Sequence, residues 1–253
     1  MGIFGSIKKG AAIAASSLPV VMILFVFSFV FNLINLMLTP ENPDPNTPPP
    51  VALIAAGIAF VLVTVYMQAG SMTYMRNKIK QSAAALSDFF AGGMRYYLKM
   101  LGLSLIMAVI IGIFVLIAAL SISQLGQTQR IVAGAIVSVC FIVGMFLLVL
   151  LFFAPYIAIC EDAGVIASLK KSKSLVLANF MKVVGLAIVL ILVGFLVGIL
   201  IGFVVGLVAR TMPPMGSKVL FAFLSSLVNS YLGLFVTASF MSFYLSRSSA
   251  PSN

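Results

Sequence analysis

The chain has no histidine and only two cysteines among its 253 residues. Histidine is the most frequent general base in enzymes, and imidazole and thiolate are the usual ligands of zinc and other transition metals. The two cysteines, Cys140 and Cys160, lie at opposite ends of one apolar run, about 30 Å apart at 1.5 Å per helical residue, so they cannot pair within the chain. We therefore predict no catalytic residue, no metal site and no cofactor.

Charge is also scarce. Only 8% of the residues are charged and 62% are hydrophobic, and 15 basic residues outnumber five acidic ones. Such a composition cannot cover the surface of a water-soluble globule, which excludes a soluble enzyme. The basic residues form no contiguous face with interleaved aromatics, as nucleic-acid binding would require. We expect an integral membrane protein that is not an enzyme and does not bind nucleic acid.

The sequence contains six long apolar runs. A bilayer core needs about 20 mainly apolar helical residues, and backbone groups in hydrocarbon must pair within their own segment. The sequence predicts an all-α polytopic helix bundle, with six transmembrane helices arranged as three hairpins in one domain over residues 1–253. The predicted spans are 14–38, 51–74, 98–122, 131–159, 183–209 and 219–245.

Positive charge is distributed unevenly between the two sides that six crossings define. Twelve of the fifteen Lys and Arg residues fall on the side of both chain ends, and only Arg130, Arg210 and Lys218 fall on the other. Basic residues beside membrane spans are held on the cytoplasmic side. We predict a multi-pass protein of the cell membrane with both termini in the cytoplasm.

The two connections on the basic side, 75–97 and 160–182, are long enough to form helices. Each is either an amphipathic helix in the headgroup plane or an elbow that leads into the next span. Glu161 and Asp162 are interpreted as the acidic first turn of such a helix, which its dipole favours. The predicted partners are membrane lipids with anionic headgroups, and the residues expected to contact them are Lys8, Lys9, Arg76, Lys78, Lys80, Lys170, Lys171 and Lys173.

The chain shows a weak internal repeat. A shift of 162 residues places Ser6 on Ser168 and Lys8 on Lys170, and a shift of 83 places Tyr97 on Phe180. Each unit would be a short amphipathic segment followed by a membrane hairpin. The predicted units are 1–85, 86–164 and 165–253, although basic-then-apolar boundaries also resemble one another by composition alone.

Four glycines at intervals of four lie in the fifth span: Gly194, Gly198, Gly202 and Gly206. A face without side chains lets another helix approach closely, and dispersion contacts and Cα hydrogen bonds then stabilise the helix pair. The pattern predicts helix packing. It is compatible with another span of the same chain or with a second copy in a homo-oligomer.

Polar side chains inside the spans are uncharged. Asn32 and Asn35 lie in the outer half of the first span, and Asn229 lies near the middle of the sixth. They predict either hydrogen bonds between helices, such as Asn229 with Asn32 or Asn35, or a polar cavity. Pro19 and Pro155 lie near the inner ends of two spans and are interpreted as helix boundaries.

Two segments carry a family resemblance. They are 153–156 (FAPY) with 161–164 (EDAG) and Asn179-Phe180, and 88–92 (DFFAG) with Tyr96-Tyr97. These stretches resemble those of uncharacterised six-span bacterial membrane proteins akin to the membrane domain attached to some glycerophosphodiester phosphodiesterases. The resemblance implies the six-span architecture and a lipid or envelope context. No phosphodiesterase domain accompanies it in this sequence, so that activity does not carry over.

The first function that these features predict is a non-enzymatic scaffold or accessory subunit in a lipid or envelope context, with a protein partner or a second copy of itself. The alternative is a channel or carrier for a neutral or amphipathic small solute, with the three asparagines lining its cavity. An enzyme that acts inside the membrane would need clustered acids, histidine or a serine with a base, and the spans offer none of these.

Overall fold

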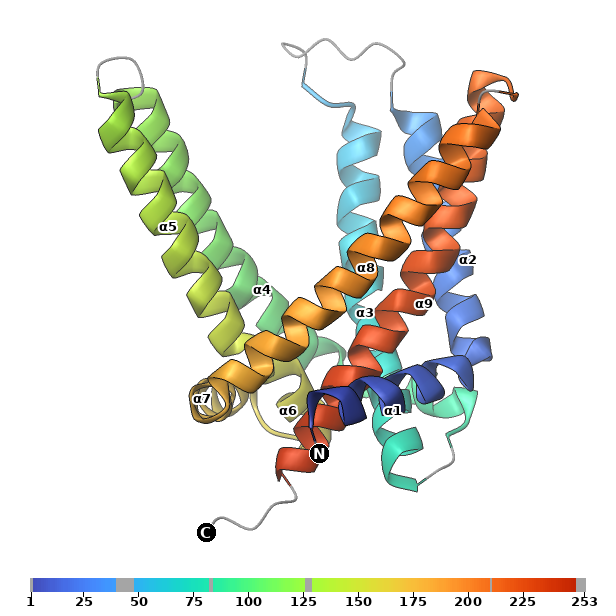
Figure 1. The fold of residues 1–253 in the computed structure, drawn as a ribbon, viewed down its shortest axis with the longest axis vertical. Coiled ribbons are helices and arrows are strands. Elements are labelled where there is room, and N and C mark those ends of the chain that lie inside the picture. The colour runs from blue at the N-terminus through green and yellow to red at the C-terminus, as the bar shows by residue number, and fades with distance from the viewer. Residues whose placement is uncertain (1, 40–47, 82–83, 126–128, 210, 249–253) are drawn as a thin grey trace. The chain divides into compact units, whose positions relative to one another are not determined.

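The computed structural model describes residues 2–39, 48–81, 84–125, 129–209 and 211–248. Within these ranges the chain forms helices and no strand (Figure 1). The helices are α1 (Ile3–Ala15), α2 (Leu18–Leu38), α3 (Val51–Gln81), α4 (Leu86–Leu125), α5 (Arg130–Leu151), α6 (Ala154–Cys160), α7 (Val165–Ala178), α8 (Phe180–Ala209) and α9 (Pro214–Ser248).

Six helical segments in the described ranges are long and apolar enough to cross a membrane: α2, α3, α4, α5 together with α6, α8 and α9. The prediction of an all-α polytopic bundle is confirmed, and the chain is a multi-pass membrane protein. The chain folds as two compact units. Unit 1 comprises residues 1–95 and 181–253, and unit 2 comprises residues 96–180.

The first span begins later than predicted because the chain breaks ahead of it. Residues 3–15 form the separate helix α1, and α2 begins at Leu18 with Pro19 in its first turn. Lys78 of α3 stabilises the break, since its Nζ donates to the Ser16 carbonyl (2.5 Å) and to the Ser17 hydroxyl (3.0 Å). A cation at the last carbonyls of α1 also complements the helix dipole.

The fourth span is interrupted at Phe152 and Phe153, between α5 and α6. Pro155 lies in the first turn of α6, where a missing backbone N–H costs no helical hydrogen bond. Ser172 of α7 fills the gap: its hydroxyl donates to the Leu150 carbonyl (2.8 Å) and accepts from the Phe153 N–H (3.1 Å). Both prolines therefore mark helix boundaries, as the sequence predicts.

The two long connections are helical. Residues 86–98 are the first part of the continuous helix α4, and the other connection contains α7. The helix-dipole explanation for Glu161 and Asp162 is wrong, because α7 has no acidic residue in its first turn. Each carboxylate instead pairs with a lysine: Lys171 Nζ lies 2.5 Å from Glu161 Oε2, and Lys99 Nζ lies 2.5 Å from Asp162 Oδ1. Asp162 has a φ of 55°, so this turn adopts a conformation that non-glycine residues seldom take.

A close helix crossing in unit 1 joins the amino-terminal helix to the carboxy-terminal helix. The amino-terminal helix α1 lies across the carboxy-terminal part of α9 (Figure 1), and Gly10 meets Ser239 there. A Cβ atom on Gly10 would lie 2.1 Å from the Ser239 hydroxyl oxygen and 2.8 Å from the Ser239 Cα and N. Only glycine fits at this position without moving one of the two backbones.

We expect Gly10→Ala to destabilise the protein by about 1–3 kcal/mol, the usual cost of forcing an extra carbon into a packed contact. The measurement is thermal unfolding in detergent, followed by circular dichroism. Gly198→Ala is the matched control: it makes the same change in α8, where an added Cβ meets nothing within 4 Å, so no loss is expected. A Gly10→Ala protein that unfolds at or above the wild-type temperature would contradict the close crossing.

Candidate functional site

A pocket of about 330 Å³ with both polar and apolar lining residues lies between α2, α3 and α9 in unit 1. One end of unit 1, at the α2–α3 connection, is called the outer end. The pocket lies toward the opposite end, where α1 packs, and we call it the inner pocket. Its lining contains amides and hydroxyls but no charged side chain. The polar lining residues are Ser28 from α2, Thr64, Gln68 and Ser71 from α3, and Asn229, Ser230 and Thr237 from α9.

Helical spacing places these groups together. On α3, Thr64, Gln68 and Ser71 follow one another by four and three residues, which puts them on one face. On α9, Asn229 and Thr237 are eight residues apart, with Gly233 between them on the same face. Apolar lining residues such as Leu24, Met67 and Leu234 belong to, or pack against, the hydrophobic core of unit 1 around Tyr74 and Met75.

Two hydroxyls in this lining are buried without a hydrogen-bond partner: Thr64 Oγ1 and Ser71 Oγ. Ser71 as a whole is only 6% exposed. The hydroxyl of a helical serine or threonine usually donates to the carbonyl four residues earlier, as Ser230 does to Ser226 (2.7 Å). A buried hydroxyl left unpaired costs about 1–3 kcal/mol. The inner pocket therefore holds hydrogen-bonding capacity that the described part of the protein does not use.

Burial alone does not distinguish Thr64 and Ser71 from other serines whose hydroxyls are buried and unpaired. The hydroxyls of Ser168 and Ser242 are also buried and unpaired, but neither lines a described pocket. The Thr64 and Ser71 hydroxyls are distinguished because they lie beside a cavity, with the exposed amide side chains of Gln68 and Asn229 in the same lining.

The structure brings two of the three predicted asparagines together. Asn32 and Asn35 line an outer α2–α3 pocket of about 390 Å³ and an outer α2–α9 pocket of about 290 Å³. Asn229 lines the inner pocket instead. The amide of Asn32 donates to the Ser226 hydroxyl (2.8 Å), so α2 and α9 are joined by a hydrogen bond, but its partner is not Asn229.

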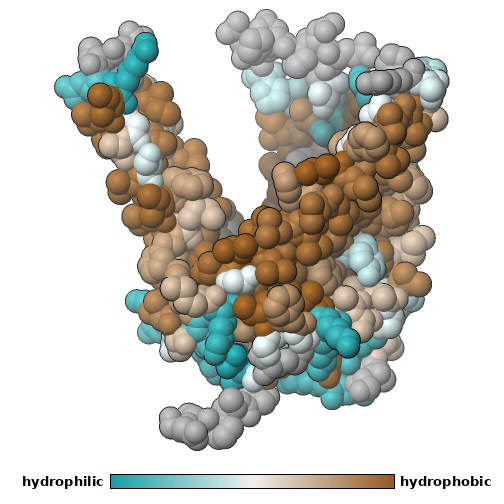
Figure 2. Space-filling view, in the orientation of Figure 1, coloured by the Kyte–Doolittle hydropathy of each residue, from teal (hydrophilic) through white to brown (hydrophobic). Residues whose placement is uncertain are grey.

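The glycine stripe makes no close contact in the described part of the chain. A Cβ added to Gly194, Gly198, Gly202 or Gly206 would meet nothing within 4 Å, so the predicted helix packing is not seen there. Large apolar side chains beside the stripe are exposed, among them Phe195 and Phe203, and Figure 2 shows hydrophobic residues along α8. A partner helix for this face stays a prediction.

The predicted basic residues have different surroundings. Lys8, Lys9, Lys80, Lys170, Lys171 and Lys173 are exposed, whereas Arg76 and Lys78 are half-buried. Lys78 binds the α1–α2 break and Lys171 pairs with Glu161. On α7, Lys170 and Lys173 share an exposed face with Ile166 and Leu177, which are 68% and 51% exposed.

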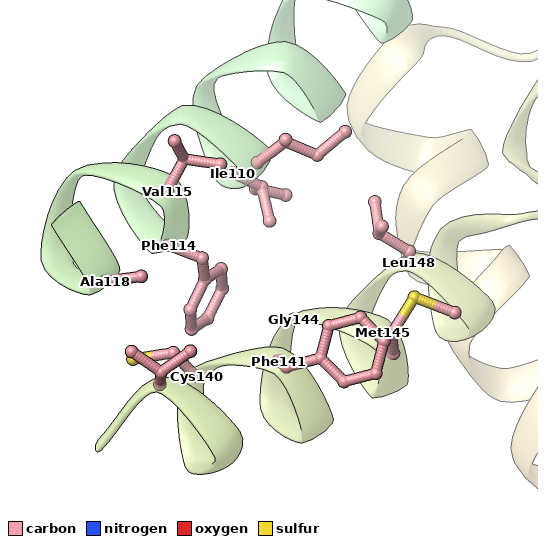
Figure 3. Close-up of a pocket in the computed structure, with 11 residues that line it drawn as sticks. Ile110, Phe114, Val115, Ala118, Cys140, Phe141, Gly144, Met145 and Leu148 are labelled. Atoms are coloured by element: carbon pink, nitrogen blue, oxygen red, sulfur yellow. The ribbon is translucent and has the colours of Figure 1, made fainter. Parts of the chain in front are cut away.

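A different kind of pocket lies in unit 2. Between α4 and α5, an apolar groove of about 290 Å³ is lined by residues such as Phe114, Phe141 and Met145 (Figure 3). The Cys140 thiol is the most polar side-chain group in its lining. Such a groove suits an acyl chain and offers no chemistry for catalysis.

The described residues hold no group of three or more acidic, cysteine or histidine side chains that could bind a metal. The amides and hydroxyls that line the inner pocket can donate hydrogen bonds to an uncharged molecule and accept hydrogen bonds from it. Sequence reasoning identified Asn229 but missed Thr64 and Ser71. The available signal was their spacing from Gln68 on one face of α3.

The comparisons with known proteins name no activity. No curated protein and no solved structure matches the chain. A family model described as a domain of unknown function, DUF7847, matches residues 1–247, and this match shows no link to glycerophosphodiester phosphodiesterases. Because the match covers nearly the whole chain, the protein belongs to the DUF7847 family.

Proposed function

We propose that this protein is a channel or carrier for a small neutral solute, which binds in the inner pocket between α2, α3 and α9. The observation that carries the proposal is the pair of buried, unpaired hydroxyls of Thr64 and Ser71 in the lining of that pocket. A solute with hydroxyl, carbonyl or amide groups would supply the missing hydrogen bonds once the two side chains rotate, because both hydroxyl oxygens are covered in the structure and do not yet face the pocket. The pocket volume is also within the usual range for small-molecule sites, roughly 300–1,000 Å³.

The lining determines the charge of the solute. A buried ion requires a counter-charge, because its transfer from water to an apolar medium costs many kcal/mol. The inner pocket offers amides and hydroxyls and no charged side chain. Neutral solutes are therefore favoured over ions of either sign.

Replacing Ser71 by alanine tests the proposal, because stability and transport should change in opposite directions. Removing an unpaired buried hydroxyl should stabilise the empty protein by about 1–3 kcal/mol. It should also lower the glycerol permeability of proteoliposomes severalfold, because the solute loses a hydrogen-bond partner. Thermal unfolding in detergent and stopped-flow light scattering measure the two effects.

Ser230→Ala is the control for this experiment. Ser230 lines the same pocket, but its hydroxyl already donates to the Ser226 carbonyl, so its removal should bring no gain in stability. The proposal is contradicted if wild-type proteoliposomes are no more permeable to glycerol than protein-free liposomes, or if Ser71→Ala leaves permeability unchanged.

A second candidate function is the scaffold or accessory subunit near anionic lipid, which the exposed face of α7 favours. Ile166, Lys170, Lys173 and Leu177 lie along one side of that helix, with apolar residues flanking two cations. Such a face suits the headgroup region, where the cations meet phosphates and the apolar side chains meet acyl chains. In this second function, the basic connections lie in the cytoplasm. The protein would act in the lipid or envelope context that the family resemblance implies.

We expect the double substitution Lys170→Gln and Lys173→Gln to weaken the binding of phosphatidylglycerol by about 2 kcal/mol, at roughly 1 kcal/mol for each basic residue at an anionic surface. Native mass spectrometry of protein released from nanodiscs of mixed phosphatidylglycerol and phosphatidylcholine measures the retained lipid. Lys171→Gln is the control, because Lys171 already pairs with Glu161 and should contribute less. Equal losses in the control and the double variant would contradict this role for the exposed face.

A further inference from the structure

Three pockets of unit 1 adjoin α2: two lie side by side at its outer end, and the inner pocket lies nearer its start. The two outer pockets share Asn32 and Asn35, and the outer α2–α3 pocket shares Phe60 with the inner pocket. From Gly57 in the outer α2–α3 pocket to Ser71 in the inner pocket, the lining covers 14 steps of α3. At 1.5 Å per residue this is about 21 Å, most of a hydrocarbon core about 30 Å thick.

Two helices present polar faces along this series. On α2, Ser28, Asn32 and Asn35 are spaced by four and three residues, so they share one side of the helix, and each of them lines at least one of the three pockets. On α9, the lining continues from Ser225 in the outer α2–α9 pocket to Asn229 in the inner one, four residues apart. Polar lining residues thus recur along two of the three helices.

An aromatic cluster interrupts the series where α2 faces α3. Phe31 lines the outer α2–α3 pocket, Phe27 lines the inner pocket, and Phe60 lines both. The Phe60 ring stacks on Phe27 with centroids 5.5 Å apart and contacts Phe31 at 4.7 Å. Phe27 and Phe31 also contact one another at 5.1 Å. The three rings therefore form a single apolar contact between the two cavities.

We propose that α2, α3 and α9 form a two-site path for a neutral solute, with a second binding site at Asn32 and Asn35 and an apolar barrier of Phe27, Phe31 and Phe60 between the sites. The inference rests on the proposed function and extends it. Apolar constrictions oppose the passage of water and polar solutes because a narrow apolar gap empties of water. Movement of the Phe60 ring would connect the two sites, and polar groups on either side would bind the solute before and after this step.

The Phe60→Ala variant tests the barrier. Removing the ring shared by both cavities should raise the glycerol permeability of proteoliposomes at least about threefold over wild type. Phe223→Ala is the matched control: Phe223 belongs to a second aromatic cluster, with centroids 5.1 Å from Phe25 and 5.5 Å from Phe29, but it lines none of the three pockets. The control should leave permeability at the wild-type value.

Two further variants separate this inference from the proposed function. Asn35→Leu in the Phe60→Ala background should lower the raised permeability, because the solute loses the outer site, and Ser71→Ala in the same background should lower it through the inner site. If Ser71→Ala lowers wild-type permeability but Phe60→Ala behaves like Phe223→Ala, the barrier is wrong and the proposed function stands. If Phe60→Ala raises permeability but neither added substitution lowers it, the solute does not use these sites and both proposals fail.

Discussion

The bilayer interior offers no partner for a polar group, and this constraint governs the whole molecule. The backbone meets it by forming helices, whose groups pair within their own segment. Side chains meet it where the helices break or cross: Ser172 fills the gap between α5 and α6, and the Thr73 hydroxyl donates to the Ala69 carbonyl. Against this background, the unpaired hydroxyls of Thr64 and Ser71 in the lining of a pocket are an exception, and the proposed solute site rests on them.

Close helix contacts recur at the inner ends of the spans, where other helical segments cross the spans. Shifts of 162 and 83 residues place Gly10 and Phe89 on Ser172. Gly10 meets Ser239, the backbone of Phe89 approaches Gly70, and Ser172 binds Phe153. Each partner adjoins a buried alanine, Ala238, Ala69 or Ala154, although the shifts of 162 and 83 residues do not place these alanines on one another. The division into three related units stays a prediction, and the two compact units divide the chain differently.

The sequence predicted the spans well because their length and apolarity follow directly from the thickness of hydrocarbon. It placed the start of the first span at Ala14 instead of Leu18, since composition does not reveal that Lys78 binds the Ser16 carbonyl and holds a break there. The glycine stripe of α8 shows that spacing encodes the capacity for close packing and not the partner. Thr64 and Ser71 were missed because helical hydroxyls ordinarily bond to their own backbone, so only the three-dimensional structure distinguishes the ones that do not.

Charge along the path argues further for a neutral solute. Lys218 lines the outer α2–α9 pocket, where its ammonium group opposes the entry of cations. On the α2–α3 side, an anion would meet the rings of Phe27, Phe31 and Phe60, which provide no counter-charge. Beyond the rings, the inner pocket again holds only amides and hydroxyls among its polar side chains. Along the proposed path a cation would therefore be opposed at the outer α2–α9 pocket and an anion at the three rings, whereas an uncharged molecule would find hydrogen-bonding groups on both sides.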